Sequence, residues 1–151
     1  EKVEIAKKFV GVTQSTGDRF VVPILVGLII GRIGCFIVGL QDDTFGNPTS
    51  VPWAVDFGDG IPRHPTQLYD IGFALVALWL LLRFKSVLVR ESGLQFKLML
   101  AGYLLWRLAI DGLKPVPYAW LGGLGGIQLV CLAALLVYLP MTLRQFSRLR
   151  T

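Results

Sequence analysis

Three charged side chains, those of Arg32, Arg107 and Asp111, interrupt long apolar stretches of this 151-residue sequence. A guanidinium remains charged in a poorly hydrated site, and its fork of N–H donors matches the oxygens of phosphate or carboxylate. An arginine exposed to hydrocarbon costs at least a few kcal/mol, so each one is expected to face a partner, a cavity or a ligand. The chemistry that these residues suit is therefore the recognition of an anion.

Arg32 lies in an apolar run of residues 20–40 that is interrupted by glycines. At about 1.5 Å per residue, it lies roughly 18 Å along a helix that begins with this run. That depth is past the middle of a bilayer and several residues short of the exit, which favours a buried contact over snorkelling to the interface. Gly27 and Gly31 form a small-xxx-small pair that suits close packing of helices.

Tyr103, Arg107 and Asp111 are spaced four residues apart, so they share one face of a helix. Two interpretations of this face remain open, a structural ion pair of Arg107 with Asp111 and a binding site. Arg32 favours the site, because two arginines at similar depth on two helices can hold one anionic head group. A phospholipid supplies such an anion at that depth.

The segment Arg63-His64 precedes another apolar run and lies close to Gln67 and Tyr69. A lone histidine of this kind is more often a surface or hydrogen-bonding residue than a catalyst. His64 is nevertheless the only side chain here whose ordinary pKa suits acid or base chemistry near neutrality. Gln67 and Tyr69 can either orient a head group or cap the start of a helix.

The composition indicates a protein that crosses a membrane several times. Hydrophobic residues make up 54% of the chain and charged residues 17%, and the mean hydropathy is +0.62. The net charge is +5, and the positive residues gather at the ends of apolar segments. This placement indicates the orientation of the chain in the membrane and attraction to anionic lipid. No nucleic-acid partner is expected. Cys35 and Cys131 have no metal-like spacing, so neither a metal nor a cofactor is expected.

The apolar segments predict an all-α fold, a polytopic membrane helical bundle with about four transmembrane helices and one long loop at residues 41–65. Thr66 is expected as the N-cap of the second helix, with Asp70 in its first turns, where a negative charge suits the helix dipole. The predicted spans are residues 20–39, 66–84, 94–113 and 120–143.

Lysine and arginine gather in the N-terminal segment, in the connection between the second and third spans, and at the C-terminus. With four spans these three regions share one side, which the positive-inside rule makes cytoplasmic. The loop at residues 41–65 is then extracytoplasmic. Residues 1–151 are expected to form a single membrane domain, the C-terminal part of a longer transferase-like protein.

An ordered series of motifs resembles the second half of the prolipoprotein diacylglyceryl transferase family, over roughly residues 20–143. The motifs stand in the same order and with similar spacing, which makes the series much more specific than any one of them. They are Gly31-Arg32-Ile33-Gly34-x-Phe36-Ile37-x-Gly39, Gly46-x-Pro48-Thr49, Pro52-Trp53, Arg63-His64-Pro65-Thr66-Gln67-Leu68-Tyr69, and Tyr103-x-x-x-Arg107-x-x-x-Asp111 with Lys114-Pro115.

The resemblance implies a transferase of the bacterial inner membrane that acts in lipoprotein biosynthesis. Such an enzyme moves the diacylglyceryl group of phosphatidylglycerol to the lipobox cysteine of a preprolipoprotein and releases glycerol phosphate. The implied partners are phosphatidylglycerol, other phospholipids and the preprolipoprotein signal peptide. Arg32 and Arg107 would bind and polarise the head group, and His64 is the one available proton acceptor. The remaining expected substrate-binding residues are Gly31, Gly34, Gly39, Arg63, Gln67, Tyr69, Tyr103 and Asp111.

The sequence departs from the family pattern at Cys35, Val38 and Leu40, where the family has two asparagines and a glutamate. Asp42 or Asp43 is a possible replacement for that glutamate. These departures motivate a second hypothesis, a catalytically silent lipid-binding subunit that keeps the family fold within a larger membrane complex. Half of a transporter is a weaker hypothesis, because no internal repeat is found.

Overall fold

The computed structural model describes residues 16–115 and 124–148 of the chain. Four long α-helices account for most of these residues, namely α2 (Val21–Val38), α3 (Thr66–Arg83), α5 (Leu94–Asp111) and α6 (Gly126–Ser147). The short elements are the 3-10 helices η1 (Gly17–Phe20) and η2 (Gly39–Asp42), the strands β1 (Val55–Asp56) and β2 (Pro62–Arg63), and the single-turn helix α4 (Lys85–Leu88).

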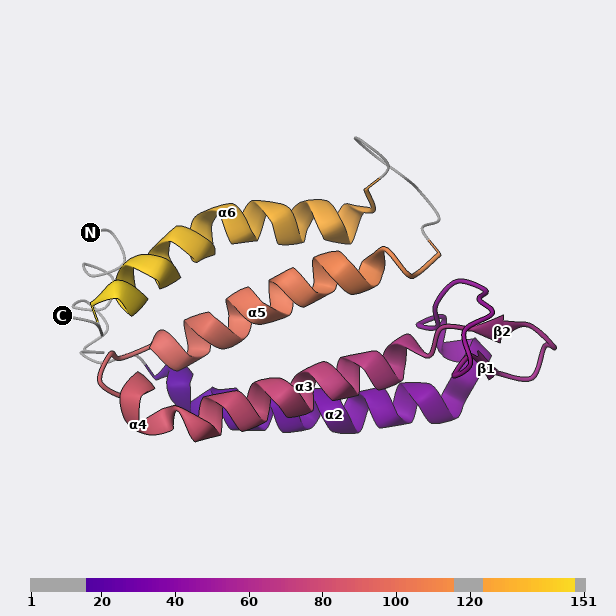
Figure 1. Cartoon of the computed structure of the whole chain (residues 1–151), viewed down its shortest axis with the longest axis horizontal. Helices are drawn as coiled ribbons and strands as arrows, with labels where there is room; N and C mark the ends of the chain where they lie inside the picture. Colours follow the sequence, from indigo (N-terminus) through magenta and orange to yellow (C-terminus); the bar gives the residue numbers. More distant parts are fainter. Residues whose placement is uncertain (1–15, 116–123, 149–151) are drawn as a thin grey trace.

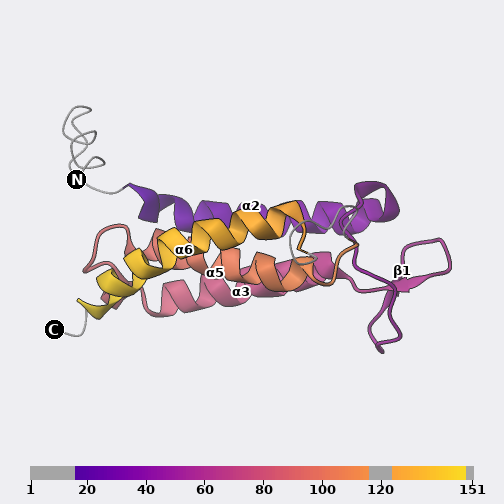
Figure 2. The same ribbon diagram turned by 90° about the horizontal axis from the view of Figure 1, so that it is seen from above.

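The four long helices lie side by side as two antiparallel pairs (Figures 1 and 2). Helix α2 packs mainly on α3, and α5 packs mainly on α6. The loop of residues 39–65 lies at one end of the bundle, called here the loop end. Helix α4, the start of α2 and the end of α6 lie at the opposite end, called here the α4 end.

The prediction of an all-α polytopic membrane fold is confirmed. Three helical segments in the described ranges are long and apolar enough to cross a membrane, Gly17–Asp42, Thr66–Arg83 and Gly126–Ser147. Helix α5 falls outside this set and is less apolar, because it contains Lys97, Arg107 and Asp111. The first three predicted spans match α2, α3 and α5 within two residues. The fourth begins at residue 126 rather than 120, and residues 116–123 lie outside the described ranges.

The predicted loop at residues 41–65 contains a small hairpin in which β1 pairs with β2 in an antiparallel register. The carboxylate of Asp56 accepts backbone N–H bonds from Gly58, Asp59 and Gly60, which fixes the turn between the strands. The backbone N–H of Asn47 donates to the carbonyl of Leu113 at 2.7 Å, and that bond ties the loop to the end of α5. The loop is therefore attached to the bundle.

Gly46 lies where the loop crosses the start of α3, and no side chain fits there. Its N–H donates to the carbonyl of His64 at 2.9 Å. A Cβ atom at Gly46 would lie 2.6 Å from the Cβ of His64 and 3.0 Å from the carbonyl oxygen of Leu113. The close approach of these backbones holds the His64 segment against both the loop and α5.

A carboxylate from η1 caps helix α5 across the bundle. Asp18 accepts hydrogen bonds from the backbone N–H groups of Gly93 at 2.7 Å and Phe96 at 2.9 Å. These groups have no partner within the helix, and a negative charge at this end also suits the helix dipole. The contact joins the start of the first span to the start of α5 at the α4 end.

The buried interior changes character along the bundle. Its apolar core lies towards the α4 end and includes Val21, Leu25, Ala74, Leu81, Leu88, Leu94 and Met99. Towards the loop end the buried residues include polar and charged side chains, those of Thr66, Gln67, Asp70 and Asp111. Large apolar side chains are exposed on all four long helices, as expected of surfaces that meet lipid. The candidate site is therefore at the loop end.

Two expectations from the sequence are wrong. Thr66 is not an N-cap but the first residue of α3; Pro65 occupies the cap position, and the Thr66 hydroxyl donates to the carbonyl of Thr44. The small-residue packing expected at Gly27 and Gly31 is also missing from the described residues, because nothing lies within 4 Å of a Cβ built at either. Helix α3 packs on another face of α2.

Candidate anion-binding site

Arg32 on α2 forms an ion pair with Asp70 on α3, and its Nε lies 2.8 Å from Oδ2 of Asp70. The Asp70 side chain is 2% exposed and that of Arg32 is 14% exposed. Among the described residues, no hydrogen bond engages the two terminal nitrogens of Arg32. The ion pair thus fixes the position of the guanidinium through Nε and leaves its two terminal nitrogens available to a ligand.

A second contact holds the Asp70 carboxylate from helix α5. The indole N–H of Trp106 donates to Oδ1 of Asp70 at 2.7 Å. The ring of Phe73 stacks on Trp106 with centroids 5.1 Å apart and an angle of 11° between the planes. Asp70 therefore joins three helices, since it binds α2 through an ion pair and α5 through a hydrogen bond.

Arg107 and Asp111 form the ion pair that the spacing allowed. Nη2 of Arg107 lies 3.0 Å from Oδ1 of Asp111 and 3.2 Å from Oδ2. Tyr103, one turn earlier, packs near Phe73 with ring centroids 6.4 Å apart. In the described parts of the chain, Nε and Nη1 of Arg107 donate no hydrogen bond, so this arginine also has free donors.

Lys114 brings a third cation to the same region, just beyond the end of α5. Burial lowers the pKa of Lys114 below its ordinary value; the charges of Arg107 and Arg32 lower it further, whereas those of Asp70 and Asp111 raise it. All four charges therefore act on this ammonium. Three cations against two carboxylates leave one positive charge in excess, which complements the single negative charge of a phosphodiester.

Gln67 lies one turn before Asp70 on α3 and is completely buried. Neither the oxygen nor the nitrogen of its amide has a hydrogen-bond partner in the described structure. An unpaired buried polar group costs about 1–3 kcal/mol, so such groups normally find a partner. The amide of Gln67 is suited to a ligand that offers both a donor and an acceptor, as a glycerol phosphate does.

A chain of polar rings connects the loop to the start of α3. The indole N–H of Trp53 donates to the hydroxyl of Tyr69 at 2.7 Å, and this hydroxyl lies 3.1 Å from Nδ1 of His64. The Tyr69 oxygen accepts the indole bond and can either donate its own proton to Nδ1 or accept a second bond from Nδ1–H. Nε2 of neutral His64 is a hydrogen-bond donor in the first arrangement and an acceptor in the second.

Arg63 is engaged within the loop. Its Nη1 donates to Oδ1 of Asp59 at 2.7 Å, and its guanidinium lies 4.8 Å from the ring centroid of Phe45. The hydrogen bond from Arg63 lowers the pKa of the Asp59 carboxyl below its ordinary value. Arg63 therefore stabilises the hairpin, and no contact joins it to Arg32 or Arg107 in the described residues.

The expected glycines have different surroundings. Gly31 and Gly34 are exposed on α2, and nothing lies within 4 Å of a Cβ built at either. Gly39 is buried with φ of 69°, where it ends α2 and lies against Phe57. A positive φ favours glycine at this position, because glycine has no Cβ. None of the three glycines therefore belongs to the cluster around Arg32 and Asp70.

Three residues of this cluster were not identified by the sequence reasoning as members of the site. The sequence places Asp70 in the first turns of a helix, where it suits the helix dipole, gives no signal for Trp106, and includes Lys114 only within a motif. The signal for Asp70 was present, because a carboxylate inside an apolar helix needs a partner as much as an arginine does. Trp106 and Lys114 depend on how α3 and α5 meet, which spacing along one helix does not show.

The residues that depart from the family pattern lie around the end of α2. Cys35 is a partly buried free thiol, and Val38 is 53% exposed. Leu40 is partly buried in η2. The carboxylate of Asp42 is bonded by the hydroxyl of Thr44, and Asp43 is in a left-handed conformation with φ of 53°. No ion pair joins either aspartate to Arg32 in the described structure.

The fold and the site together define a multi-pass α-helical membrane protein with a charged, partly buried cluster near one end of its bundle. The sequence profile of the prolipoprotein diacylglyceryl transferase family matches residues 6–144. This chain belongs to that family, which is a family of bacterial membrane enzymes.

Individual relatives agree with the family match. The chain is similar to the phosphatidylglycerol–prolipoprotein diacylglyceryl transferases of Bordetella parapertussis (41% identity, 64% of this chain and 37% of the relative), Bordetella avium (37%, 77% and 44%) and Shewanella oneidensis (41%, 72% and 39%). The chain thus spans less than half the length of these relatives. No solved structure gives a significant match.

Proposed function

We propose that this chain forms the head-group-binding part of a transferase that moves the diacylglyceryl group of phosphatidylglycerol to the lipobox cysteine of a prolipoprotein. The membership of the family and the names of the relatives support this activity. The observation that carries the proposal is the buried pair of Arg32 with Asp70, which leaves the terminal guanidinium nitrogens free. Arg107 and Lys114 add positive charge to the same region, and the buried amide of Gln67 has no partner of its own in the described structure.

The orientation of the charges is part of the proposal. The α4 end carries an excess of cations, which include Arg83, Lys85, Arg90 and Arg144, whereas the loop is acidic through Asp42, Asp43, Asp56 and Asp59. By the positive-inside rule, the α4 end and the C-terminus face the cytoplasm. The anion-binding cluster then lies in the outer half of the bacterial inner membrane, where phosphatidylglycerol and the lipobox meet.

The reaction is a displacement at a glycerol carbon. The acceptor cysteine loses its thiol proton and its sulfur forms the new S–C bond, the C–O bond to the phosphate breaks, and glycerol phosphate leaves with the electron pair and takes up one proton. Arg32 and Arg107 stabilise the negative charge that develops on the departing phosphate, because their donors are already held in place by Asp70 and Asp111. These side chains therefore favour leaving-group departure.

His64 is proposed as a donor to the head group rather than as the base for the thiol. When the hydroxyl of Tyr69 donates to Nδ1, the remaining ring nitrogen carries the proton and can donate it to a phosphate oxygen. A His64→Gln variant, which keeps a donor at a similar position, is expected to retain more transfer activity than His64→Ala.

The direct test uses the full-length protein in phosphatidylglycerol vesicles with a lipobox peptide as acceptor. Transfer should be lost in Arg32→Ala and in Arg107→Ala, and it should be unchanged in Arg90→Ala, a matched arginine at the α4 end. If wild-type protein retains phosphatidylglycerol on purification but transfers nothing, the enzymatic proposal is wrong. The departures at Cys35, Val38 and Leu40 would then favour the silent lipid-binding subunit of a larger membrane complex.

A further inference from the structure

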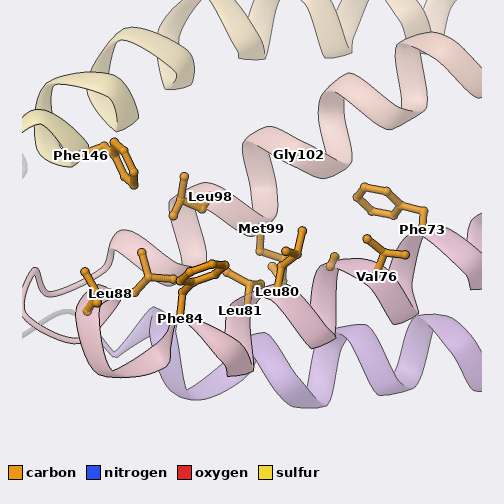
Figure 3. A pocket seen from close by; sticks show the side chains of 12 residues that line it. Phe73, Val76, Leu80, Leu81, Phe84, Leu88, Leu98, Met99, Gly102 and Phe146 are labelled. Carbon is orange, nitrogen blue, oxygen red and sulfur yellow. The ribbon is translucent and has the colours of Figure 1, made fainter.

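An apolar groove of about 500 Å³ lies between α3 and α5 and reaches the end of α6 (Figure 3). Nearly all of its lining is apolar, and every side chain that lines it is apolar. The side chains that define its course are Phe73, Leu80, Phe84, Leu98, Met99 and Phe146. We call it the α3–α5 groove.

The groove begins beside the charged cluster. Phe73 lines one end of the groove, and the same ring stacks on Trp106, whose indole binds the Asp70 carboxylate. In Figure 3, Phe73 and Val76 mark this end, and Phe84 and Phe146 lie at the other. The charged cluster and the groove are therefore continuous along α3.

The length of the groove suits a single lipid tail. From Phe73 to Phe84 the helix rises about 16 Å at about 1.5 Å per residue. One acyl chain spans about 15 Å, half of the roughly 30 Å hydrocarbon core of a bilayer. A head group at the level of Asp70 would therefore place its tail along the full groove.

The groove is also accessible from the side. Val76 is 57% exposed, Leu80 41% and Phe84 50%, although all three line it. In a membrane these side chains meet lipid, so a tail can enter laterally without leaving hydrocarbon. Water-soluble ligands have no such route, and the lining offers them no polar partner.

We propose that the α3–α5 groove holds one acyl chain of the phospholipid whose head group binds Arg32. This inference rests on the head-group site proposed above and adds the position of the lipid tail. The excess positive charge at one end and the apolar lining beyond it match the two parts of an anionic phospholipid in their natural order.

The groove positions the tail and contributes little to affinity. A tail that moves from lipid into the groove gains no hydrophobic free energy, because both surroundings are apolar. The groove instead restricts the conformational freedom of the tail. Packing of the tail against Leu98 and Met99 aligns the glycerol carbons with the charged cluster. The appropriate readout is therefore the location of the tail.

The test uses full-length protein in nanodiscs with phosphatidylglycerol that carries a diazirine at the end of one acyl chain. After photolysis, peptides are mapped by mass spectrometry. Crosslinks should be several-fold more frequent at Leu98, Met99 and Phe146 than at Leu105 and Leu136, which are exposed on the outer faces of α5 and α6. Equal labelling of both groups would overturn the inference, as would protection of the groove by another helix of the protein.

Two controls connect the labelling to the groove and to the head group. Ala77→Phe fills the groove and should reduce labelling several-fold, whereas Leu75→Phe on the exposed face of α3 should leave it unchanged. The same diazirine on phosphatidylcholine should label the groove several-fold less; an equal yield would show general lipid packing and contradict the inference.

Parallel transfer assays on the same nanodiscs separate the two proposals. Transfer without selective labelling would contradict the acyl-chain position alone. Selective labelling without transfer would contradict the transferase proposal and leave the lipid site intact. If Arg32→Gln abolishes neither the selective labelling nor the transfer, Arg32 does not hold the head group at the end of the groove. The inference then also fails.

Discussion

Arg32 on α2 and Asp70 on α3 are joined by an ion pair 2.8 Å long whose carboxylate is almost completely buried. The pair explains how an arginine can lie inside an apolar helix, because its charge is balanced by a carboxylate that is itself bonded by Trp106. It also connects two of the three helices that contribute residues to the proposed head-group site. Most of the behaviour expected of the site follows from this contact.

Removing the carboxylate should be more harmful than removing both charges. Asp70→Ala leaves the Arg32 guanidinium partly buried and unpaired, which should lower the free energy of unfolding by up to about 3 kcal/mol. The double variant Arg32→Gln with Asp70→Asn should recover part of that loss. Thermal unfolding of the purified full-length variants measures both. Equal destabilisation of the single and double variants would show that the pair is not coupled.

The indole N–H of Trp106 should matter separately from its ring. Trp106→Phe keeps an aromatic face for Phe73 but leaves one oxygen of Asp70 without its donor, at a cost of about 1–3 kcal/mol. Trp79→Phe, on the exposed face of α3, is the matched control and should change stability by less than about 0.5 kcal/mol. Similar losses in both variants would contradict the assigned hydrogen bond.

Gly46 should tolerate no side chain. The Cβ of Gly46→Ala would come within 2.6 Å of His64, so the loop must shift away from α3 and α5. We expect lower thermal stability and faster proteolysis within residues 41–65. Gly72→Ala is the control, since its Cβ would meet nothing within 4 Å and alanine is the better helix former. An unchanged loop in Gly46→Ala would show that the contact is not tight.

Lys114 should give lipid binding a pH dependence below the pH at which an ordinary lysine titrates. Its pKa is lowered mainly by burial, so it loses its proton at a lower pH than an ordinary lysine with a pKa near 10.4. Between the lowered and the ordinary pKa the unfolded chain binds more protons, so stability rises with pH through that window while anion binding falls. Titration of phosphatidylglycerol binding should show this fall in wild type and not in Lys114→Arg. Identical profiles would exclude Lys114 from the site.

The cap that Asp18 provides to α5 should contribute to stability without touching the lipid site. Asp18→Ala removes the acceptor for two backbone N–H groups and should cost about 1–2 kcal/mol. Phosphatidylglycerol affinity at temperatures below unfolding should be unchanged. A loss of affinity with no loss of stability would reverse this assignment.

The sequence alone predicted where the long helices lie and that Arg32 and Arg107 need partners, because apolar length and isolated charges are local properties. The four predicted spans correspond to α2, α3, α5 and α6, and the pairing of Arg107 with Asp111 follows from a spacing of four. Partners on different helices were harder to predict. The contact of Arg32 with Asp70 depends on the rotation of α2 against α3, which neither hydropathy nor spacing specifies.

The contacts of the loop at residues 41–65 were also hard to predict from the sequence. Glycines and prolines indicated irregular backbone, but the bond of Asn47 to Leu113 and the approach of Gly46 to His64 connect residues far apart in sequence. Thr66 illustrates how tertiary contacts override a local preference, because its hydroxyl finds Thr44 in the loop and leaves the helix start uncapped. Local rules thus predicted the elements better than the contacts between them.

The central claim is that Arg32, held by Asp70, binds the phosphate of an anionic phospholipid. The most direct measurement is the affinity of full-length protein for phosphatidylglycerol, compared among wild type, Arg32→Gln and the control Arg90→Gln by native mass spectrometry of defined nanodiscs. We predict a loss of at least about tenfold, or about 1.4 kcal/mol, for Arg32→Gln and no change for Arg90→Gln. Equal affinity in all three proteins would contradict the claim.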